Sequence, residues 1–190
     1  MAEVSVKICG LTREQDVDAA VAAGADMVGF VIVSDSPRGL DADRARELAR
    51  GVPQGVRSVA VYADLDLVPE DVHDHFDLLQ VYGIPAVRER VIVAFRGSPP
   101  APLPDGVPVL LDRPQGVVSE PDQLRRHWQA AATVRAPVMV AGGLDPDNVG
   151  EAVRTAKPWA VDTARGVESA PGIKDPALIE RFIHNAKDAA

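Results

Sequence analysis

The chain has 190 residues, a formal net charge of −8 at pH 7 and a hydrophobic fraction of 46%. This length suits a single domain, residues 1–190, with a sizeable core, and the acidic balance argues against a nucleic-acid partner. One cysteine permits no internal disulfide, which fits a reducing cytoplasm, and no apolar run is long enough to predict a membrane span.

The chain begins with a short apolar run, residues 4–8, which ends at its only cysteine, Cys9. Thr12 and Gln15 follow with the spacing of a capping box, so we expect a helix to start at Thr12. The thiol therefore lies where a strand ends and a helix begins. In α/β proteins that edge of the sheet carries the chemistry.

Strand-like apolar runs alternate with amphipathic helical runs along the whole chain. The expected strands are residues 4–8, 27–33, 57–62, 77–81, 91–95, 107–112, 138–141 and 159–162. The expected helices are residues 12–23, 42–50, 69–75, 121–132, 146–157 and 176–186.

Eight nearly all-apolar strands in this rhythm indicate a parallel sheet that is covered on both faces. We therefore predict a compact, closed (β/α)8 barrel, the TIM barrel. The alternative is an open doubly wound sheet, which usually has five or six strands.

Two units of the predicted barrel are short. Residues 82–90 leave room for one or two helical turns, and residues 99–108 contain five prolines and cannot be helical. We expect a minimal fourth helix and no fifth, which would leave an apolar wall that a second subunit could cover. The chain is thus expected to be a monomer or a homodimer.

Cys9 is the first candidate for chemistry. A reactive cysteine needs a lowered thiol pKa, which the helix after Cys9 and the cation of Lys7 could provide. Strand alternation places Lys7 and Cys9 on the same face. The alternative is that Cys9 is a small buried hydrophobe.

Charged residues follow three further strands. Asp112 closes the sixth strand and is a plausible general acid, because a carboxyl group at a buried position is costly to ionise. Asp162 closes the eighth strand and could bind hydroxyl groups. Arg38 follows the second strand and could clamp a substrate carboxylate. The alternatives are a cap for each aspartate and a solvated loop residue for the arginine.

Glycines follow the last two strands. Gly142 and Gly143 end the seventh, and a small-residue turn with Gly166 follows the eighth. TIM barrels bind phosphate at these two loops through exposed N–H groups. The four histidines show no metal-ligand spacing, so we expect no metal.

Several stretches of the sequence carry a family resemblance. They are Val6-Lys7-Ile8-Cys9-Gly10-Leu11-Thr12, Ser36-Pro37-Arg38, Leu78-Leu79-Gln80-Val81-Tyr82-Gly83, Leu110-Leu111-Asp112, Ala141-Gly142-Gly143-Leu144-Asp145-Pro146-Asp147-Asn148, Gly166-Val167-Glu168 and Gly172-Ile173-Lys174-Asp175. In this order and spacing the chain resembles the phosphoribosylanthranilate isomerase family of tryptophan biosynthesis.

The resemblance implies a (β/α)8 barrel that needs no cofactor and converts a phosphorylated aminoaldose into an aminoketose by an Amadori rearrangement. It also implies residue roles. Cys9 would be the base that removes the C2′ proton, and Asp112 the acid that protonates the furanose ring oxygen. Arg38 would face the anthranilate carboxylate and Asp162 the sugar hydroxyls. The backbone amides that would bind phosphate are those of Gly142, Gly143, Gly166 and Val167.

The chain departs from the family pattern in three stretches, and its fourth and fifth units are also shortened. Residues 113–120 replace the usual glycine-rich loop after the sixth strand, Tyr82 replaces a histidine, and Ala164-Arg165 replaces a pair of serines. Arg165 would lie beside the phosphate site, where it could either strengthen phosphate binding or occupy the pocket. Two alternatives therefore stay open, an enzyme for another phosphorylated aminosugar or N-glycoside and a catalytically silent phosphosugar-binding paralogue.

Overall fold

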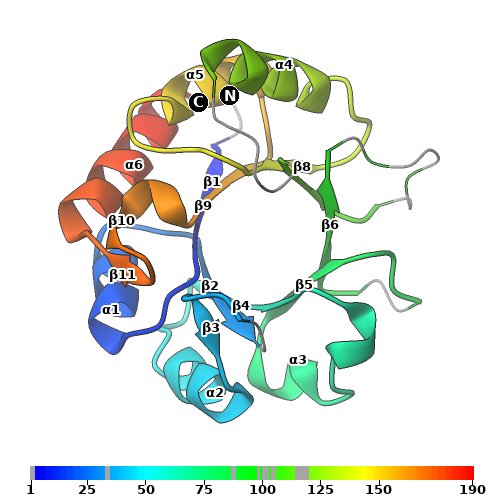
Figure 1. Ribbon diagram of the computed structural model, residues 1–190, viewed down its shortest axis with the longest axis vertical. Helices are drawn as coiled ribbons and strands as arrows, with labels where there is room; N and C mark the ends of the chain where they lie inside the picture. Colours follow the sequence, from blue (N-terminus) through cyan, green and yellow to red (C-terminus); the bar gives the residue numbers. More distant parts are fainter. Residues whose placement is uncertain are drawn as a thin grey trace.

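The computed structural model describes residues 3–32, 35–86, 89–97, 99, 103, 106–113 and 120–190. Eight parallel strands form a closed barrel, because β1 pairs with both β9 and β2 (Figure 1). They are β1 (Ser5–Cys9), β2 (Met27–Ile32), β4 (Arg57–Tyr62), β5 (Leu78–Tyr82), β6 (Val91–Arg96), β7 (Val109–Asp112), β8 (Val138–Val140) and β9 (Ala160–Thr163). The predicted (β/α)8 barrel is confirmed.

Helices surround the barrel on the outside (Figure 1). They are α1 (Glu14–Ala22), α2 (Ala42–Arg50), α3 (Val72–His75), α4 (Pro121–Ala131), α5 (Val149–Ala156) and α6 (Pro176–Asp188). Short elements complete the fold: β3 (Gly39–Leu40), the 3-10 turns η1 (Leu65–Leu67) and η2 (Arg165–Val167), and the hairpin of β10 (Glu168–Ala170) and β11 (Ile173–Lys174). No helix in the described ranges is long and apolar enough to cross a membrane.

Two hydrophobic cores result from the two faces of the barrel wall. Met27, Ile92, Leu110 and Met139 point inward and fill the barrel, and each has at most 1% of its surface exposed. The outward side chains of the same strands pack against the helices in a larger cluster. The barrel is therefore a filled core, and ligands are confined to its ends.

Helix α1 begins later than the capping box predicts. Arg13 is the N-cap residue and makes no side-chain cap. The Thr12 hydroxyl instead donates to the Gly172 carbonyl at 2.8 Å, far along the chain. The predicted capping box is therefore wrong, since a tertiary partner engages the hydroxyl that local spacing assigned to the helix.

The two short units are reduced as expected. The described residues between β5 and β6, and between β6 and β7, contain turns and no helix. Helix α3 is also only four residues long, shorter than the predicted helix over residues 69–75.

The wall beside these units is not bare, in contrast to the expectation. The outward side chains of Val91 and Val93 on β6 are 3% and 0% exposed within the single chain. Leu103, in the proline-rich segment, packs against the same core. The outward side chains of β6 are thus covered within the chain.

Candidate active site

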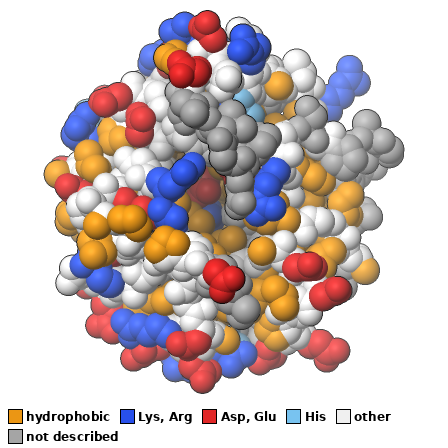
Figure 2. Space-filling view, viewed as in Figure 1, with side chains coloured by type: hydrophobic (Ala, Val, Ile, Leu, Met, Phe, Trp, Pro, Cys, Tyr) orange, Lys and Arg blue, Asp and Glu red, His pale blue; other side chains and the backbone are white. Residues whose placement is uncertain are grey.

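A cavity of about 510 Å³ lies at the carboxyl ends of the barrel strands. Figure 2 shows a hollow near the centre of this face, with basic side chains on two sides of it. The lining includes the predicted site residues Cys9, Arg38, Asp112, Gly142, Gly143, Asp162, Arg165 and Gly166. Val167, the remaining predicted residue, is fully buried in the core and is not among the residues that line the cavity, so the predicted phosphate contact of its backbone amide is not open to a ligand there.

Cys9 ends β1 and has Lys7 beside it on the inner face, as alternation predicts. A Cβ atom added to Gly29, on the neighbouring strand, would lie 3.0 Å from both Cys9 Sγ and Lys7 Nζ. The glycine therefore makes room for the two side chains. Lys7 is fully buried, and its Nζ donates to Asp162 Oδ1 at 2.9 Å.

Lys7, Cys9 and Asp162 shift one another's pKa values. Burial raises the pKa of the Cys9 thiol, and the nearby cation of Lys7 opposes this rise only in part. Burial likewise raises the pKa of Asp162 against the opposing effect of Lys7. Burial alone would lower the pKa of Lys7, but the charges of Asp162 and Cys9 outweigh it and raise that pKa. Lys7 acts on the thiol in the predicted direction, although the net shift is upward.

Asp112 ends β7, three strands from Cys9 through β9 and β8. Its Oδ2 accepts a hydrogen bond of 2.9 Å from the Tyr82 hydroxyl, and its Oδ1 accepts one of 2.8 Å from the Arg113 amide. Burial and the neighbouring Asp112 raise the pKa of Tyr82, so this hydroxyl keeps its proton. The Arg96 guanidinium lies 4.0 Å from the centre of the Tyr82 ring.

The two glycine loops pack against each other. Gly142 and Gly143 both have positive φ angles, 83° and 84°, which favour glycine. A Cβ atom at Gly166 would overlap the Leu144 carbonyl oxygen, and the Thr163 hydroxyl donates to that same oxygen at 2.7 Å. The loops after β8 and β9 therefore form one wall of the cavity, whose backbone a ligand can approach closely.

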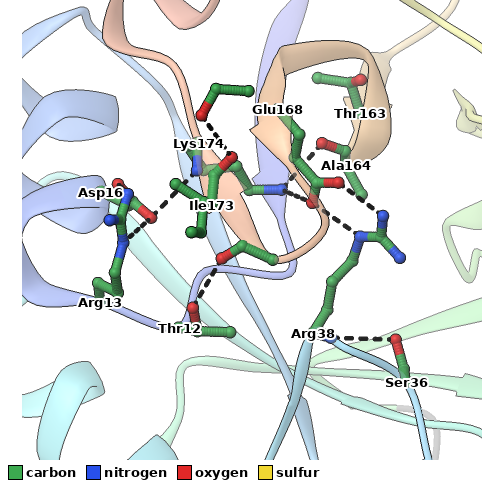
Figure 3. A network of polar contacts seen from close by, with 12 residues as sticks. Thr12, Arg13, Asp16, Ser36, Arg38, Thr163, Ala164, Glu168, Ile173 and Lys174 are labelled. Carbon is green, nitrogen blue, oxygen red and sulfur yellow. Dashed lines mark hydrogen bonds and ion pairs between the residues drawn. The ribbon is translucent and has the colours of Figure 1, made fainter.

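Arg38 belongs to an ionic network (Figure 3). Its Nε and Nη2 donate to the two carboxylate oxygens of Glu168 at 2.8 and 2.6 Å. Lys174 Nζ donates to Glu168 Oε1 at 3.0 Å and to the Ala164 carbonyl at 2.8 Å. Burial would raise the pKa of Glu168, but its hydrogen bonds to Arg38 and Lys174 hold that pKa below its usual value. Arg38 is thus a fixed residue and not a solvated one.

Gln80, Tyr82, Arg96 and Arg113 also line the cavity, and the sequence analysis assigned no site role to them. The period of two along β5 could have identified Gln80 and Tyr82, since both share the inner face with Leu78. Arg165 lies exposed at the rim.

Two further expectations concern metals and the loop after β7. No cluster of three or more potential metal ligands occurs in the described part of the chain. The expected departure at residues 113–120 falls largely outside the described residues, which end at 113 and resume at 120.

Comparison with known proteins identifies the family. The model of the N-(5′-phosphoribosyl)anthranilate (PRA) isomerase family matches residues 6–95 and 110–185. The isomerase of Geobacter sulfurreducens is 40% identical over 97% of this chain and 98% of its own length.

Solved structures give the same result. The structure of TrpF from Jonesia denitrificans has a TM-score of 0.79 and 34% identity, over 98% of both chains. A phosphoribosyl anthranilate isomerase in complex with reduced 1-(o-carboxyphenylamino)-1-deoxyribulose 5-phosphate has a TM-score of 0.77 and 30% identity, over 97% of this chain and 99% of that one. The chain belongs to the N-(5′-phosphoribosyl)anthranilate isomerase family.

Proposed function

We propose that this chain catalyses the Amadori rearrangement of N-(5′-phosphoribosyl)anthranilate to 1-(o-carboxyphenylamino)-1-deoxyribulose 5-phosphate, with Cys9 as base and Asp112 as acid. Family membership supports the isomerase activity in tryptophan biosynthesis. The observation that carries the residue roles is that the only thiol and a strand-end carboxyl group line one cavity from separate parts of the barrel wall.

The reaction needs two proton transfers at different atoms. Asp112 gives its proton to the furanose ring oxygen as the C1′–O bond breaks, and the amine nitrogen supplies electrons to form the iminium. The Cys9 thiolate then removes the C2′ proton, which gives an enolamine that tautomerises to the aminoketose. Burial keeps the free thiol protonated, so the Lys7 cation is the group that makes the thiolate accessible.

Substrate binding divides among three parts of the cavity. The backbone of Gly142, Gly143 and Gly166 binds the phosphate, and Arg165 adds a cation at the rim. Arg38 faces the anthranilate carboxylate with the donors that Glu168 leaves unused. Asp162 accepts hydrogen bonds from sugar hydroxyls. The cavity thus offers cations to both anionic ends of the substrate.

The site favours this activity over the alternatives. Both proton-transfer groups are present and hydrogen-bonded or charge-paired, which argues against a catalytically silent paralogue. Arg165 adds a cation where a phosphate would lie, so this departure from the family pattern does not require another substrate. Reducing conditions keep a catalytic thiol from oxidising, and we therefore propose that the enzyme works in the cytoplasm.

A coupled fluorescence assay tests the proposal. It generates N-(5′-phosphoribosyl)anthranilate in situ and follows the loss of its emission when the protein is added. Cys9→Ala and Asp112→Asn should each lower kcat by at least about a hundredfold, while Glu151→Gln on the outside of α5 keeps wild-type activity. Full turnover by either site variant contradicts its role, and no turnover by folded wild-type protein contradicts the function.

A further inference from the structure

We propose that Gln80 is a substrate-binding residue whose side-chain amide hydrogen bonds to a hydroxyl group of the substrate's sugar. This inference deepens the proposed function and rests on it for the identity of the substrate. Nothing in the sequence pattern separates Gln80 from the apolar strand around it except its polarity.

The position of Gln80 directs it into the barrel. It lies in the middle of β5, in register with Val61 on β4 and Ile92 on β6. Both of these neighbours belong to the inner hydrophobic core. Gln80 is 3% exposed and is among the residues that line the cavity, so its side chain lies deep in the site.

The amide has an unpaired acceptor. Gln80 Oε1 is buried and has no hydrogen-bond partner among the described residues. The Tyr82 hydroxyl, on the same face of β5, donates to Asp112 instead. Buried polar groups are nearly always paired, and leaving one unpaired disfavours the folded state. A polar residue at such a position is readily explained if a ligand completes its hydrogen bonds.

The chemistry of the substrate selects the hydroxyl. The phosphate and the carboxylate only accept hydrogen bonds, so neither can satisfy Oε1. The donors of the substrate are its amine N–H and its sugar hydroxyls. A sugar hydroxyl both donates and accepts, which matches an amide in either orientation of its last side-chain bond.

The layout of the barrel agrees with this choice. In the closed strand order β5 lies four strands from β9 in either direction, so Gln80 faces Asp162 across the barrel. The phosphate loops follow β8 and β9, and Arg38 follows β2. Gln80 and Asp162 therefore approach the middle of the substrate, its sugar, from opposite walls.

Gln80→Met provides a test with two opposite effects. Methionine keeps the length of the side chain without its polar atoms, so the variant should unfold at a temperature about 2–4 °C higher, since the unpaired group is gone. Its kcat/KM should fall about tenfold, as expected for one lost hydrogen bond. Leu79→Met is the matched control, because Leu79 lies on the same strand and packs in the outer core. It should leave kcat/KM unchanged.

Competitive inhibition separates the sugar from the rest of the substrate. Ribulose 5-phosphate carries the hydroxyls without the amine, and inorganic phosphate carries neither. Gln80→Met should lower the affinity for ribulose 5-phosphate about tenfold and leave the affinity for inorganic phosphate unchanged. Unchanged affinity for both ligands, or an equal loss for both, overturns the proposal.

Direct titration of ribulose 5-phosphate keeps this test independent of turnover. If the wild-type protein does not isomerise the proposed substrate, the proposed function fails, but a selective loss of ribulose 5-phosphate binding in the variant still supports the role of Gln80. Gln80→Leu repeats the measurement if the methionine variant does not fold.

Discussion

Lys7 lies between the Asp162 carboxylate and the Cys9 thiol, the proposed catalytic base. It is fully buried, bonds Asp162 at 2.9 Å and lies against the Cys9 thiol. A buried ammonium group needs an anionic partner to stay charged. Lys7 has two such partners, because Asp162 and the thiolate form of Cys9 compete for its single positive charge.

This arrangement predicts opposite effects of two substitutions on Cys9. Lys7 lowers the thiol pKa and Asp162 raises it. Lys7→Met should therefore raise the pKa of Cys9 further, and Asp162→Asn should lower it. Because Cys9 is the only cysteine, the pH dependence of alkylation by iodoacetamide reports its thiolate directly.

At pH 8 we expect Lys7→Met to be alkylated about tenfold more slowly than the wild type, which corresponds to a pKa higher by one. Asp162→Asn should react faster. The measurement includes thermal melts of all three proteins, so that partial unfolding is not mistaken for a pKa change. Faster alkylation of Lys7→Met would contradict the effect of the Lys7 charge on the thiol, and slower alkylation of Asp162→Asn would contradict that of Asp162.

Predictability from the sequence was greatest for residues that share one inner strand face. Alternation placed Lys7 beside Cys9, and strand ends placed Asp112 and Asp162 at the cavity. The same rule did not reveal that Tyr82 bonds Asp112 or that Lys7 bonds Asp162, since each pair joins residues far apart in the sequence. Tyr82 and Asp112 come from the two strands that flank β6, and closure of the barrel makes β1 and β9 neighbours with Lys7 in register with Asp162.

At the scale of elements, Glu168 joins the loop after β2 to the β10–β11 hairpin. Its side chain is 5% exposed, and it accepts hydrogen bonds from Arg38 and from the fully buried Lys174. The Thr12 hydroxyl ties the start of α1 to the same hairpin. This explains why local sequence misplaced the start of α1, because the residues there serve contacts with the other end of the chain.

Glu168→Gln should destabilise the fold and loosen Arg38. Breaking a buried charge pair leaves the remaining cations unmatched and costs about 3 kcal/mol. We expect a lower free energy of unfolding in urea and a higher KM, with a smaller effect on kcat. Glu151→Gln, which removes the solvent-facing pair with Arg125, is the control and should change stability little.

The pH dependence of stability provides a second measurement on Glu168. The folded state lowers its pKa, so its contribution is present above the ordinary glutamate pKa and is lost as the pH falls through the folded-state value. The wild type should lose stability over this acidic range more steeply than Glu168→Gln. Parallel curves would contradict the network's charge-dependent role.

For the whole molecule, hydrophobic periodicity was sufficient to predict a barrel, because each strand contributes to both cores. It was not sufficient to predict which residues cover the barrel wall beside the two short units. The family model does not match residues 96–109. This stretch is rich in proline and has no hydrophobic periodicity, so its sequence does not indicate how it packs. The prediction of a bare wall failed there, since Val91 and Val93 are covered within the chain.

The covered wall leads to a prediction about assembly. A stable dimer usually buries about 800 Å² on each partner around an apolar centre. In the described part of the chain only Leu67, Ile84 and Ile173 are large hydrophobic side chains with much exposed surface. We therefore expect a monomer of 20.2 kDa in light scattering coupled to gel filtration at micromolar concentration.

Activity per chain should then be independent of protein concentration, because every residue proposed for the site lies in one barrel. A mass near twice that of the chain would contradict this expectation. In that case Ile84→Lys, in the loop after β5, distinguishes the possible interfaces. A return to the monomer would place the contact beside the short units, whereas an unchanged dimer would place it elsewhere on the surface.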